Sequence, residues 1–350
     1  MPLFLDLHKA GDYEAKPTAE EIKKNHIADL SVQKKYGVRF IQYWINEDQG
    51  MVFCLMEGPD KESCAAVHRE AHGNMPCNII ELKGGDYKIY LGEEGKANQF
   101  DIVENSDGTF DSGTRIFIAV DLLSVESISP SYKIIRDAFT TFHGREISHP
   151  GDRLLVVFNS AQQAARCAAT ILKQLKKINR TEVQIGICAG YPLTDKDNFF
   201  EAGVNLAHRH CDVAIDGHVF VSANVKGLSG TSFENDKSDT FRIITPEEEK
   251  FITRLLNIIH PSLDQPDFNV DSICKQIGIS RAQLYRKVVS LTGMAPNNFV
   301  KELRLKKAVR LIRRNKGNIA QVAYETGFNN PSYFSTIFQR RFGVLPSQLS

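Results

Sequence analysis

The chain has 350 residues, a formal net charge of +1 and 42% hydrophobic residues. This length is enough for two or three domains of ordinary size, and the composition excludes a disordered or fibrous protein. The seven cysteines, an odd number without a Cys-x-x-Cys pair, form neither a disulfide framework nor a zinc knuckle, so we expect reduced thiols. The first residues do not resemble a signal peptide, and no apolar run reaches the roughly 18 residues of a membrane span. We therefore expect a cytoplasmic protein without a membrane partner.

The charge is distributed unevenly along the chain. Residues 250–350 contain 16 Lys and Arg against 5 Asp and Glu, whereas the other residues contain 27 against 37. This imbalance favours a basic module that binds nucleic acid, fused to acidic domains. A basic face that is merely solvated is the alternative.

Polar and glycine-rich stretches divide the chain into three globular segments, and we predict a multidomain α+β protein. The predicted boundaries are a domain at 1–83, a linker at 84–112, a domain at 113–228, a linker at 229–246 and a helical domain at 247–350.

The N-terminal segment is expected to form strands and helices in the order β-α-β-β-α-β. Apolar runs alternate there with amphipathic stretches, and glycines end both helices. The expected elements cover residues 3–8, 19–36, 38–45, 51–57, 61–72 and 78–82. This order is that of the ferredoxin-like fold.

Four of the ten histidines lie in this segment. His68 and His72 are four residues apart on one predicted helix, which is a metal-ligand spacing. In this topology the end of that helix lies at the same edge as His8, which ends the first strand. The three imidazoles suit Ni, Zn or Cu, and Asp6 and His26 are further candidates. The alternative is that these histidines cap helices or pair with acidic residues.

Three strings in this segment are residues 6–8 (DLH), 29–38 (DLSVQKKYGV) and 67–73 (VHREAHG). With these strings the segment resembles a small family of ferredoxin-like proteins associated with nickel binding in bacteria. The resemblance covers nearly the whole segment, and it implies Ni or another divalent transition metal as the cofactor.

Residues 113–228 show a second α/β pattern. We expect strands at 115–121, 154–158, 183–189 and 218–222, helices at 161–177 and around 204–209, and a hairpin turn at 150–153. This order resembles the class III nucleotidyl cyclases, in which two aspartates hold two metal ions and an Asn and an Arg stabilise the transferring phosphoryl group. The matching positions are Asp121, Asp152, Asn205 and Arg209.

The sequence departs from the cyclase pattern at positions that matter for activity. Ser148 and Asn198 replace the residues that read the purine, Glu201 replaces a glycine, and the loop after Asp121 contains no glycine. The resemblance therefore implies a degenerate cyclase-like domain that serves for dimerisation or ligand sensing, without cyclase activity. Because the family's active sites form between two chains, it also implies a homodimer.

The C-terminal segment contains two helix-turn-helix patterns. In the first, a helix at 271–277 ends at Gly278, and Ser280 can cap a helix at 281–291. In the second, a helix at 319–326 ends at Gly327 and is followed by a helix at 331–342. A long basic helix at 297–314 joins them and would separate the recognition helices by about 34 Å, one turn of DNA. We predict an all-α double helix-turn-helix domain.

These residues resemble the AraC/XylS family over about 100 residues. The matching strings are residues 280–287 (SRAQLYRK), 291–293 (LTG), 304–308 (RLKKA), 319–323 (IAQVA), 327–334 (GFNNPSYF), 338–343 (FQRRFG) and 346–347 (PS).

The resemblance assigns three groups of side chains. The residues expected in one major groove are Arg281, Ala282, Gln283, Tyr285 and Arg286. Those expected in the next groove are Ser332, Tyr333, Ser335 and Thr336. The expected phosphate contacts are Lys306, Lys307, Arg340 and Arg341, whereas Leu284 and Phe338 are expected in the core.

Together these patterns predict a sequence-specific transcription regulator that responds to a metal ion or a small ligand. Its expected partners are double-stranded DNA and a second copy of the chain, and RNA polymerase is a further candidate. Two alternatives stay open. One is a nucleotidyl cyclase with regulatory flanking domains, which Asp121 and Asp152 favour. The other is a metal-buffering protein.

Overall fold

The computed structural model of the chain describes residues 1–9, 18–83, 86–92, 97–105, 108–123, 128–147, 153–178, 182–228, 240–314 and 317–349. The chain forms two compact units. The first contains Met1–Arg115 and Ala189–Val204, and the second contains Ile116–Cys188 and Asn205–Ser350. Among the described residues, no helix combines the length and the apolar character that crossing a membrane requires.

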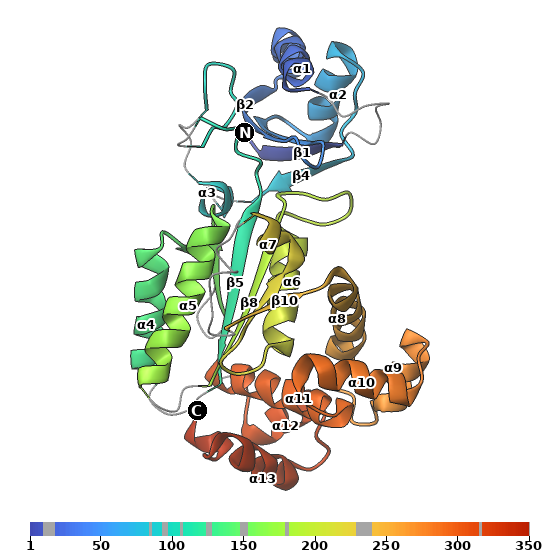
Figure 1. Cartoon of the computed structure of the whole chain (residues 1–350). Helices are drawn as coiled ribbons and strands as arrows, with labels where there is room; N and C mark the ends of the chain where they lie inside the picture. The colour runs from blue at the N-terminus through green and yellow to red at the C-terminus, as the bar shows by residue number, and fades with distance from the viewer. Residues whose placement is uncertain are drawn as a thin grey trace. The chain divides into compact units, whose positions relative to one another are not determined.

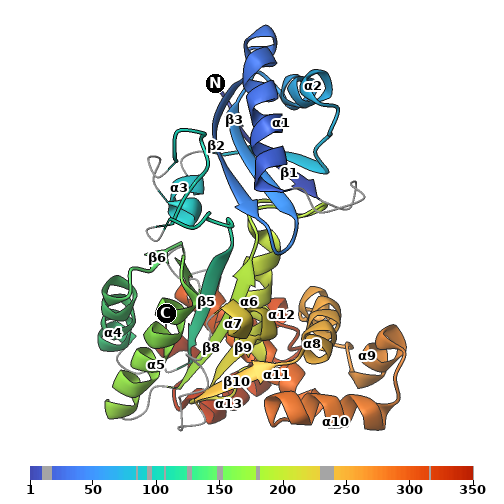
Figure 2. The ribbon, with the colours of Figure 1, turned by 45° about the horizontal axis from the view of Figure 1, so that its top comes forward.

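The first unit contains a four-stranded antiparallel sheet with two helices on one face (Figure 2). Its elements are β1 (Leu3–Lys9), α1 (Ala19–Val32), a 3-10 helix (Gln33–Tyr36), β2 (Arg39–Asn46), β3 (Met51–Glu57), α2 (Lys61–Ala71), β4 (Asn78–Leu82) and α3 (Asp86–Leu91). The strand order β2-β3-β1-β4 confirms the ferredoxin-like fold.

Local signals fix the ends of these helices. Thr18 and Glu21 form a reciprocal capping box at the start of α1, and Asp60 caps α2 through the backbone N–H of Ser63. Gly37 has a φ of 65°, a conformation that glycine adopts without steric penalty, and it turns the chain into β2.

The predicted linker at 84–112 contains α3 and a segment that lies along β2. The backbone N–H of Tyr43 in β2 donates to the carbonyl of Asp101, and the backbone carbonyl of Tyr43 accepts from the N–H of Val103. Further along, the backbone N–H of Ile45 donates to the carbonyl of Asp111. An edge strand exposes unpaired backbone groups, and this segment satisfies those of β2.

The second unit begins with a six-stranded sheet in the order β10-β9-β8-β5-β7-β6. Its elements are β5 (Arg115–Leu122), α4 (Ile128–Thr141), β6 (Arg145–Glu146), β7 (Leu154–Phe158), α5 (Ala161–Lys177), β8 (Val183–Gly190), α6 (Glu201–Val213), β9 (Val219–Ser222), α7 (Ala223–Leu228) and β10 (Phe241–Ile244). The order β8-β5-β7-β6 repeats the ferredoxin-like pattern, and β9 and β10 extend it as parallel strands. β10 thus lies within the predicted linker 229–246. Of the predicted turn at 150–153, residues 150–152, which include Asp152, lie outside the described residues, and so does Ser148.

Helices cover both faces of this sheet. α4 and α5 lie on one face and α6 on the other (Figure 1). α6 packs closely on β8, because Gly186 has no side chain: a Cβ at this position would lie 2.4 Å from the backbone N of Cys211 and 2.5 Å from the carbonyl of Ala207.

The remaining helices form the predicted all-α domain with two helix-turn-helix motifs. They are α8 (Pro246–Ile259), a 3-10 helix (His260–Ser262), α9 (Val270–Ile277), α10 (Arg281–Thr292), α11 (Pro296–Arg313), α12 (Ile319–Glu325), α13 (Pro331–Phe342) and a 3-10 helix (Pro346–Gln348). Gly278 ends α9 with a φ of 76°, and Ser280 and Gln283 form a capping box that starts α10, as expected. α11 joins this motif to the second motif, formed by α12 and α13.

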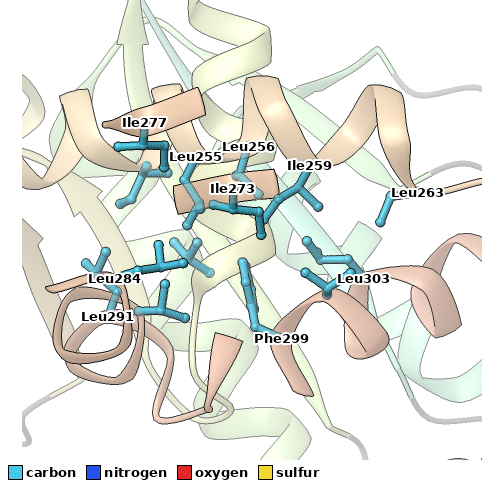
Figure 3. Packing of buried hydrophobic residues seen from close by; sticks show 14 of the residues in the cluster. Leu255, Leu256, Ile259, Leu263, Ile273, Ile277, Leu284, Leu291, Phe299 and Leu303 are labelled. Carbon is cyan, nitrogen blue, oxygen red and sulfur yellow. The ribbon is translucent and has the colours of Figure 1, made fainter. Parts of the chain in front are cut away.

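The two motifs have different hydrophobic cores. The first motif packs with α8 around Leu256, Ile273, Leu284 and Phe299 (Figure 3), and the same cluster includes Phe220 of β9. A second cluster joins α11, α12 and α13. Its buried members are Leu305, Ala308, Val309, Ile312, Val322, Ala323, Phe328, Phe334, Ile337 and Phe338. Leu284 and Phe338 are therefore core residues, as predicted.

Gly186→Ala should destabilise the second unit, because the added methyl group collides with the backbone of α6. Overpacking of this kind typically costs about 1–3 kcal/mol. Thermal unfolding followed by circular dichroism measures the effect. Gly227→Ala is the matched control, since a Cβ there meets nothing within 4 Å. Equal stability of the two variants would contradict the close packing of α6 on β8.

Candidate metal centre and nucleic-acid interface

A pocket in the first unit collects the histidines that the sequence singled out. Its lining includes His8 from β1, His26 from α1, and His68 and His72 from α2 and its C-terminal cap. The ring centroids of His8 and His68 lie 4.6 Å apart, and those of His68 and His72 lie 5.5 Å apart. The structure therefore brings the three predicted ligands together.

The possible ligand atoms form two overlapping groups. Asp6, His8 and His68 make one, and Asp29, His68 and His72 make the other, with ligand atoms within 4.8 Å of one another in each group. His68 belongs to both. The sequence did not identify Asp29 as a candidate ligand, although its helical position one turn after His26 carries it to the same pocket.

His68 lies between two buried carboxylates. Its Nε2 is 2.8 Å from Asp6 Oδ2, and its Nδ1 is 3.1 Å from Asp29 Oδ1. Burial opposes protonation of His68, but the charges of Asp6 and Asp29 outweigh it and raise the pKa of His68 to about 10. Burial also disfavours the charged form of Asp6, yet His8 and His68 hold its pKa well below the usual value. At neutral pH a protonated imidazole thus supplies the positive charge that these carboxylates need.

These residues fit a divalent transition metal. The contact between His68 Nδ1 and Asp29 Oδ1 lacks hydrogen-bond geometry, so both atoms are buried without a hydrogen-bond partner. Buried polar atoms are rarely left in this way, and a coordinated cation would satisfy them. Imidazole and carboxylate donors suit Ni and its neighbours in the transition series.

His26, a further candidate, has a different environment. Its Nε2 is 3.2 Å from Asp101 Oδ2, and its ring lies against Tyr43 with a centroid distance of 4.5 Å. Burial lowers the pKa of His26, and Asp101 partly offsets this effect. His26 lines the pocket but belongs to neither ligand group among the described residues, so we assign it to the wall of the pocket.

The first recognition helix, α10, presents its polar face to solvent. Its candidate base contacts are all exposed: Arg281, Ala282, Gln283, Tyr285 and Arg286. Two of them have local partners. Arg281 pairs with Asp271 of α9, and the side-chain oxygen of Gln283 accepts from the backbone N–H of Ser280. Arg286 and Tyr285 are therefore the better candidates for reading bases.

The second recognition helix, α13, also has an exposed polar face. Ser332, Tyr333 and Thr336 are exposed, and Ser335 is half-buried. The hydroxyls of Ser335 and Thr336 donate to backbone carbonyls one turn earlier. They can still accept hydrogen bonds, so their base contacts would be as acceptors.

The structure corrects the assignment of Lys306 as a phosphate contact. It also shows that the other predicted phosphate contacts differ in their exposure. Lys306 is 1% exposed, and its Nζ donates to Gln184 Oε1 of β8 and to the carbonyl of Asp212. It therefore cannot reach a phosphate in this arrangement. Arg341 is partly buried in ion pairs, whereas Arg340 is exposed and Lys307 half-buried. The sequence predicted an exposed Lys306 because it lies on a basic helix, and the sequence alone does not show which elements pack against that helix.

The described cyclase-like positions do not form an open metal site. Asp121 is buried, and its Oδ2 accepts from Arg153 at 2.9 Å and from Arg310 of α11 at 3.1 Å. Burial raises the pKa of Asp121, but these guanidinium groups outweigh it and lower the pKa below the usual value. Asn205 is exposed, and Arg209 donates to Asn257 of α8. A carboxylate neutralised by two arginines has no charge left to attract a metal ion.

Family models match both ends of the chain. Residues 273–350 match the model described as "Helix-turn-helix domain", and residues 4–82 match "Nickel responsive protein SCO4226-like". The chain thus carries a helix-turn-helix domain of the AraC type at its C-terminal end. Its N-terminal domain is of the SCO4226-like nickel-responsive kind.

Curated relatives match less than a third of the chain. Histidine kinase P4 of Formosa agariphila is 37% identical over 112 residues, which are 30% of this chain and 8% of the relative. The transcriptional regulator MtrA of Neisseria gonorrhoeae is 33% identical over 97 residues, covering 27% of this chain and 32% of the relative. The activator RhaS of Escherichia coli is 32% identical over 83 residues, covering 24% and 30%. The chain spans at most a third of the length of these relatives.

Solved structures also resemble parts of the chain. SCO4226 from Streptomyces coelicolor is 32% identical with a TM-score of 0.22, covering 24% of this chain and 98% of that one. The DNA-binding domain of AdpA in complex with a target DNA is 26% identical with a TM-score of 0.26, covering 27% and 87%. An adenylate/guanylate cyclase/hydrolase from Silicibacter pomeroyi is 23% identical with a TM-score of 0.28, covering 36% and 82%.

Metal binding should release a proton from His68. Its pKa is about 10 without a metal, and an imidazole nitrogen that coordinates a metal must be unprotonated. The affinity of the full chain for Ni²⁺ is therefore expected to keep rising with pH from about 6 to about 9. Calorimetry in two buffers of different ionisation enthalpy counts the protons released. An affinity that levels off near neutral pH without proton release would mean that His68 only pairs with carboxylates.

Changing His8 and His72 together to Ala should abolish stoichiometric metal binding. Their side chains are 12% and 10% exposed, so their loss disturbs the fold less than that of the buried His68. His218→Ala is the control, because His218 precedes β9 in the second unit. Circular dichroism verifies that the double variant remains folded.

Arg286→Ala should weaken binding to a specific duplex by about 1–3 kcal/mol and relax the preference at one base pair. Arg340→Ala, at an exposed candidate phosphate contact, should instead weaken all duplexes alike. Fluorescence anisotropy with a set of singly substituted duplexes distinguishes the two patterns. If Arg286→Ala weakens every duplex equally, then Arg286 contacts a phosphate.

Proposed function

We propose that this chain is a sequence-specific DNA-binding transcription regulator whose affinity for DNA responds to a divalent transition metal ion. The observation that carries the proposal is the AraC-type domain itself, with the polar faces of both α10 and α13 exposed. The helices that would enter two successive major grooves are held on one joining helix, α11. AraC-type relatives that are named as regulators support this reading.

The metal response is assigned to the pocket of the first unit. His8, His68 and His72, with Asp6 and Asp29, would hold the ion. The donor set and the nickel-responsive family model both favour nickel. In the metal-free protein the proton on His68 offsets one of the two negative charges of Asp6 and Asp29, whereas a divalent ion in its place would offset both.

The alternative of a nucleotidyl cyclase is less well supported. Asp121 is already neutralised by Arg153 and Arg310, and Asn198 and Glu201 hydrogen-bond to each other at positions where the cyclase resemblance expects purine recognition and a glycine. We propose that the middle domain supports regulation without making cyclic nucleotides.

Double-stranded DNA is the partner that this proposal requires. A homodimer and a contact with RNA polymerase remain predictions from the sequence. The cyclase resemblance expects a second chain near Asp121. In this structure Arg310 of α11, from the same chain, contacts Asp121 instead.

Nickel should change the affinity of the full chain for DNA taken from upstream of its own gene. Allosteric coupling typically amounts to 1–3 kcal/mol, so we expect roughly a 5- to 150-fold change in the dissociation constant. Anisotropy titrations with and without Ni²⁺ measure it. The double variant His8→Ala, His72→Ala should bind the DNA but lose the response, and His218→Ala should keep it.

Two results would contradict the proposal in different ways. If the chain binds nickel but its DNA affinity does not change, then the first unit is a metal buffer, because an effector must favour one state to shift an equilibrium. If no salt-dependent DNA binding is found, the DNA-binding function itself is wrong.

A further inference from the structure

Charged groups attach the joining helix α11 and the second helix-turn-helix motif to the middle sheet. On α11, Arg310 pairs with Asp121 at 3.1 Å, and Nη1 of Arg313 donates to the carbonyl of Leu122 at 3.2 Å. Lys306 is enclosed between Gln184 and the carbonyl of Asp212. All these contacts lie at the end of the sheet where β5 stops and β8 begins.

Arg341 of α13 makes a further contact with the middle domain. Its Nη1 and Nη2 donate to the two carboxylate oxygens of Glu182 at 2.8 and 2.7 Å. The same guanidinium also binds Glu302 of α11. Glu182 precedes β8, so one residue of the middle domain holds a recognition helix of the DNA-binding domain by a bidentate ion pair.

The first motif is attached differently. Its apolar cluster is continuous with Phe220 and Ile244 of the middle sheet, whereas the cluster of the second motif contains, among the described residues, no member from that sheet. Apolar burial is insensitive to added anions, but ion pairs can be exchanged for other ion pairs. The second motif is therefore the one whose attachment a polyanion can replace.

Glu182 offers Arg341 the same chemistry as a DNA phosphate. A guanidinium binds carboxylate and phosphate through the same pair of parallel N–H donors. Arg341 cannot direct those donors to both partners at once. The contact that it makes in this structure therefore competes with the phosphate contact expected from its position on α13.

We propose that Asp121 and Glu182 form an acidic docking surface for α11 and the second helix-turn-helix motif, and that DNA phosphates compete with Glu182 for Arg341. The docked arrangement is the state of lower affinity for DNA. Release of Arg341 adds a phosphate contact and frees the second motif to adjust to the duplex. This inference rests on the proposed DNA binding, and it assigns the middle domain a role in regulating it.

The test uses the full chain and the variant Glu182→Gln, which keeps the size of the side chain and removes its charge. We expect tighter binding to nonspecific duplex DNA. We also expect a plot of log affinity against log salt that is steeper by about 0.9, the value for one additional phosphate contact. Arg341→Gln should change this slope little in the parent chain but should cancel the gain in the Glu182→Gln background.

Glu146→Gln is the matched control. Glu146 pairs with Arg136 of α4 within the middle domain, so its neutralisation should leave the salt slope unchanged. If Arg341→Gln does not fold, the comparison of Glu182→Gln with Glu146→Gln still decides. A parent chain that binds DNA with the same affinity and slope as Glu182→Gln would overturn the docking proposal alone. Failure of every variant to bind DNA would overturn the proposed function.

Discussion

A carboxylate that is buried in a protein needs a positive charge beside it, because an unpaired charge out of water costs several kcal/mol. This constraint organises both units of the chain. In the first unit, Asp6 and Asp29 surround His68. In the second, Asp121 and Asp212 both bind Arg153. The chemical properties of each site depend on which cationic group lies between its two carboxylates.

The two clusters differ in whether their cation can be exchanged. The charge on His68 is a proton, and a proton on an imidazole can be replaced by a metal ion. The charge on Arg153 is permanent, since a guanidinium does not lose its proton in proteins. In the proposed function, the histidine cluster is therefore the part that can respond to a metal ion. The arginine cluster has the chemistry of a scaffold, which explains how a cyclase-like domain can keep its aspartate without an open metal site.

The arginine cluster also reaches into the DNA-binding domain through Arg310. The first motif is held to the middle domain by a shared apolar core and the second by ionic contacts. Apolar cores are close-packed and resist separation, whereas ionic contacts respond to competing charges. Under the proposed docking, the first motif would therefore stay fixed while the second could adjust to the duplex.

The sequence by itself determined the local structure and the modules. Ser280 with Gln283 and Gly278 specified the first helix-turn-helix turn, because caps and left-handed glycines act within one or two turns of helix. His68 and His72 were identifiable because helical spacing places them on one side. Only the tertiary structure revealed the position of Asp29 beside His68 and His72 and the burial of Lys306. It also showed that residues after α3 complete the edge of β2. Those features depend on contacts between residues far apart in the chain, and burial and pairing of a charge are properties of its neighbours that no local pattern encodes.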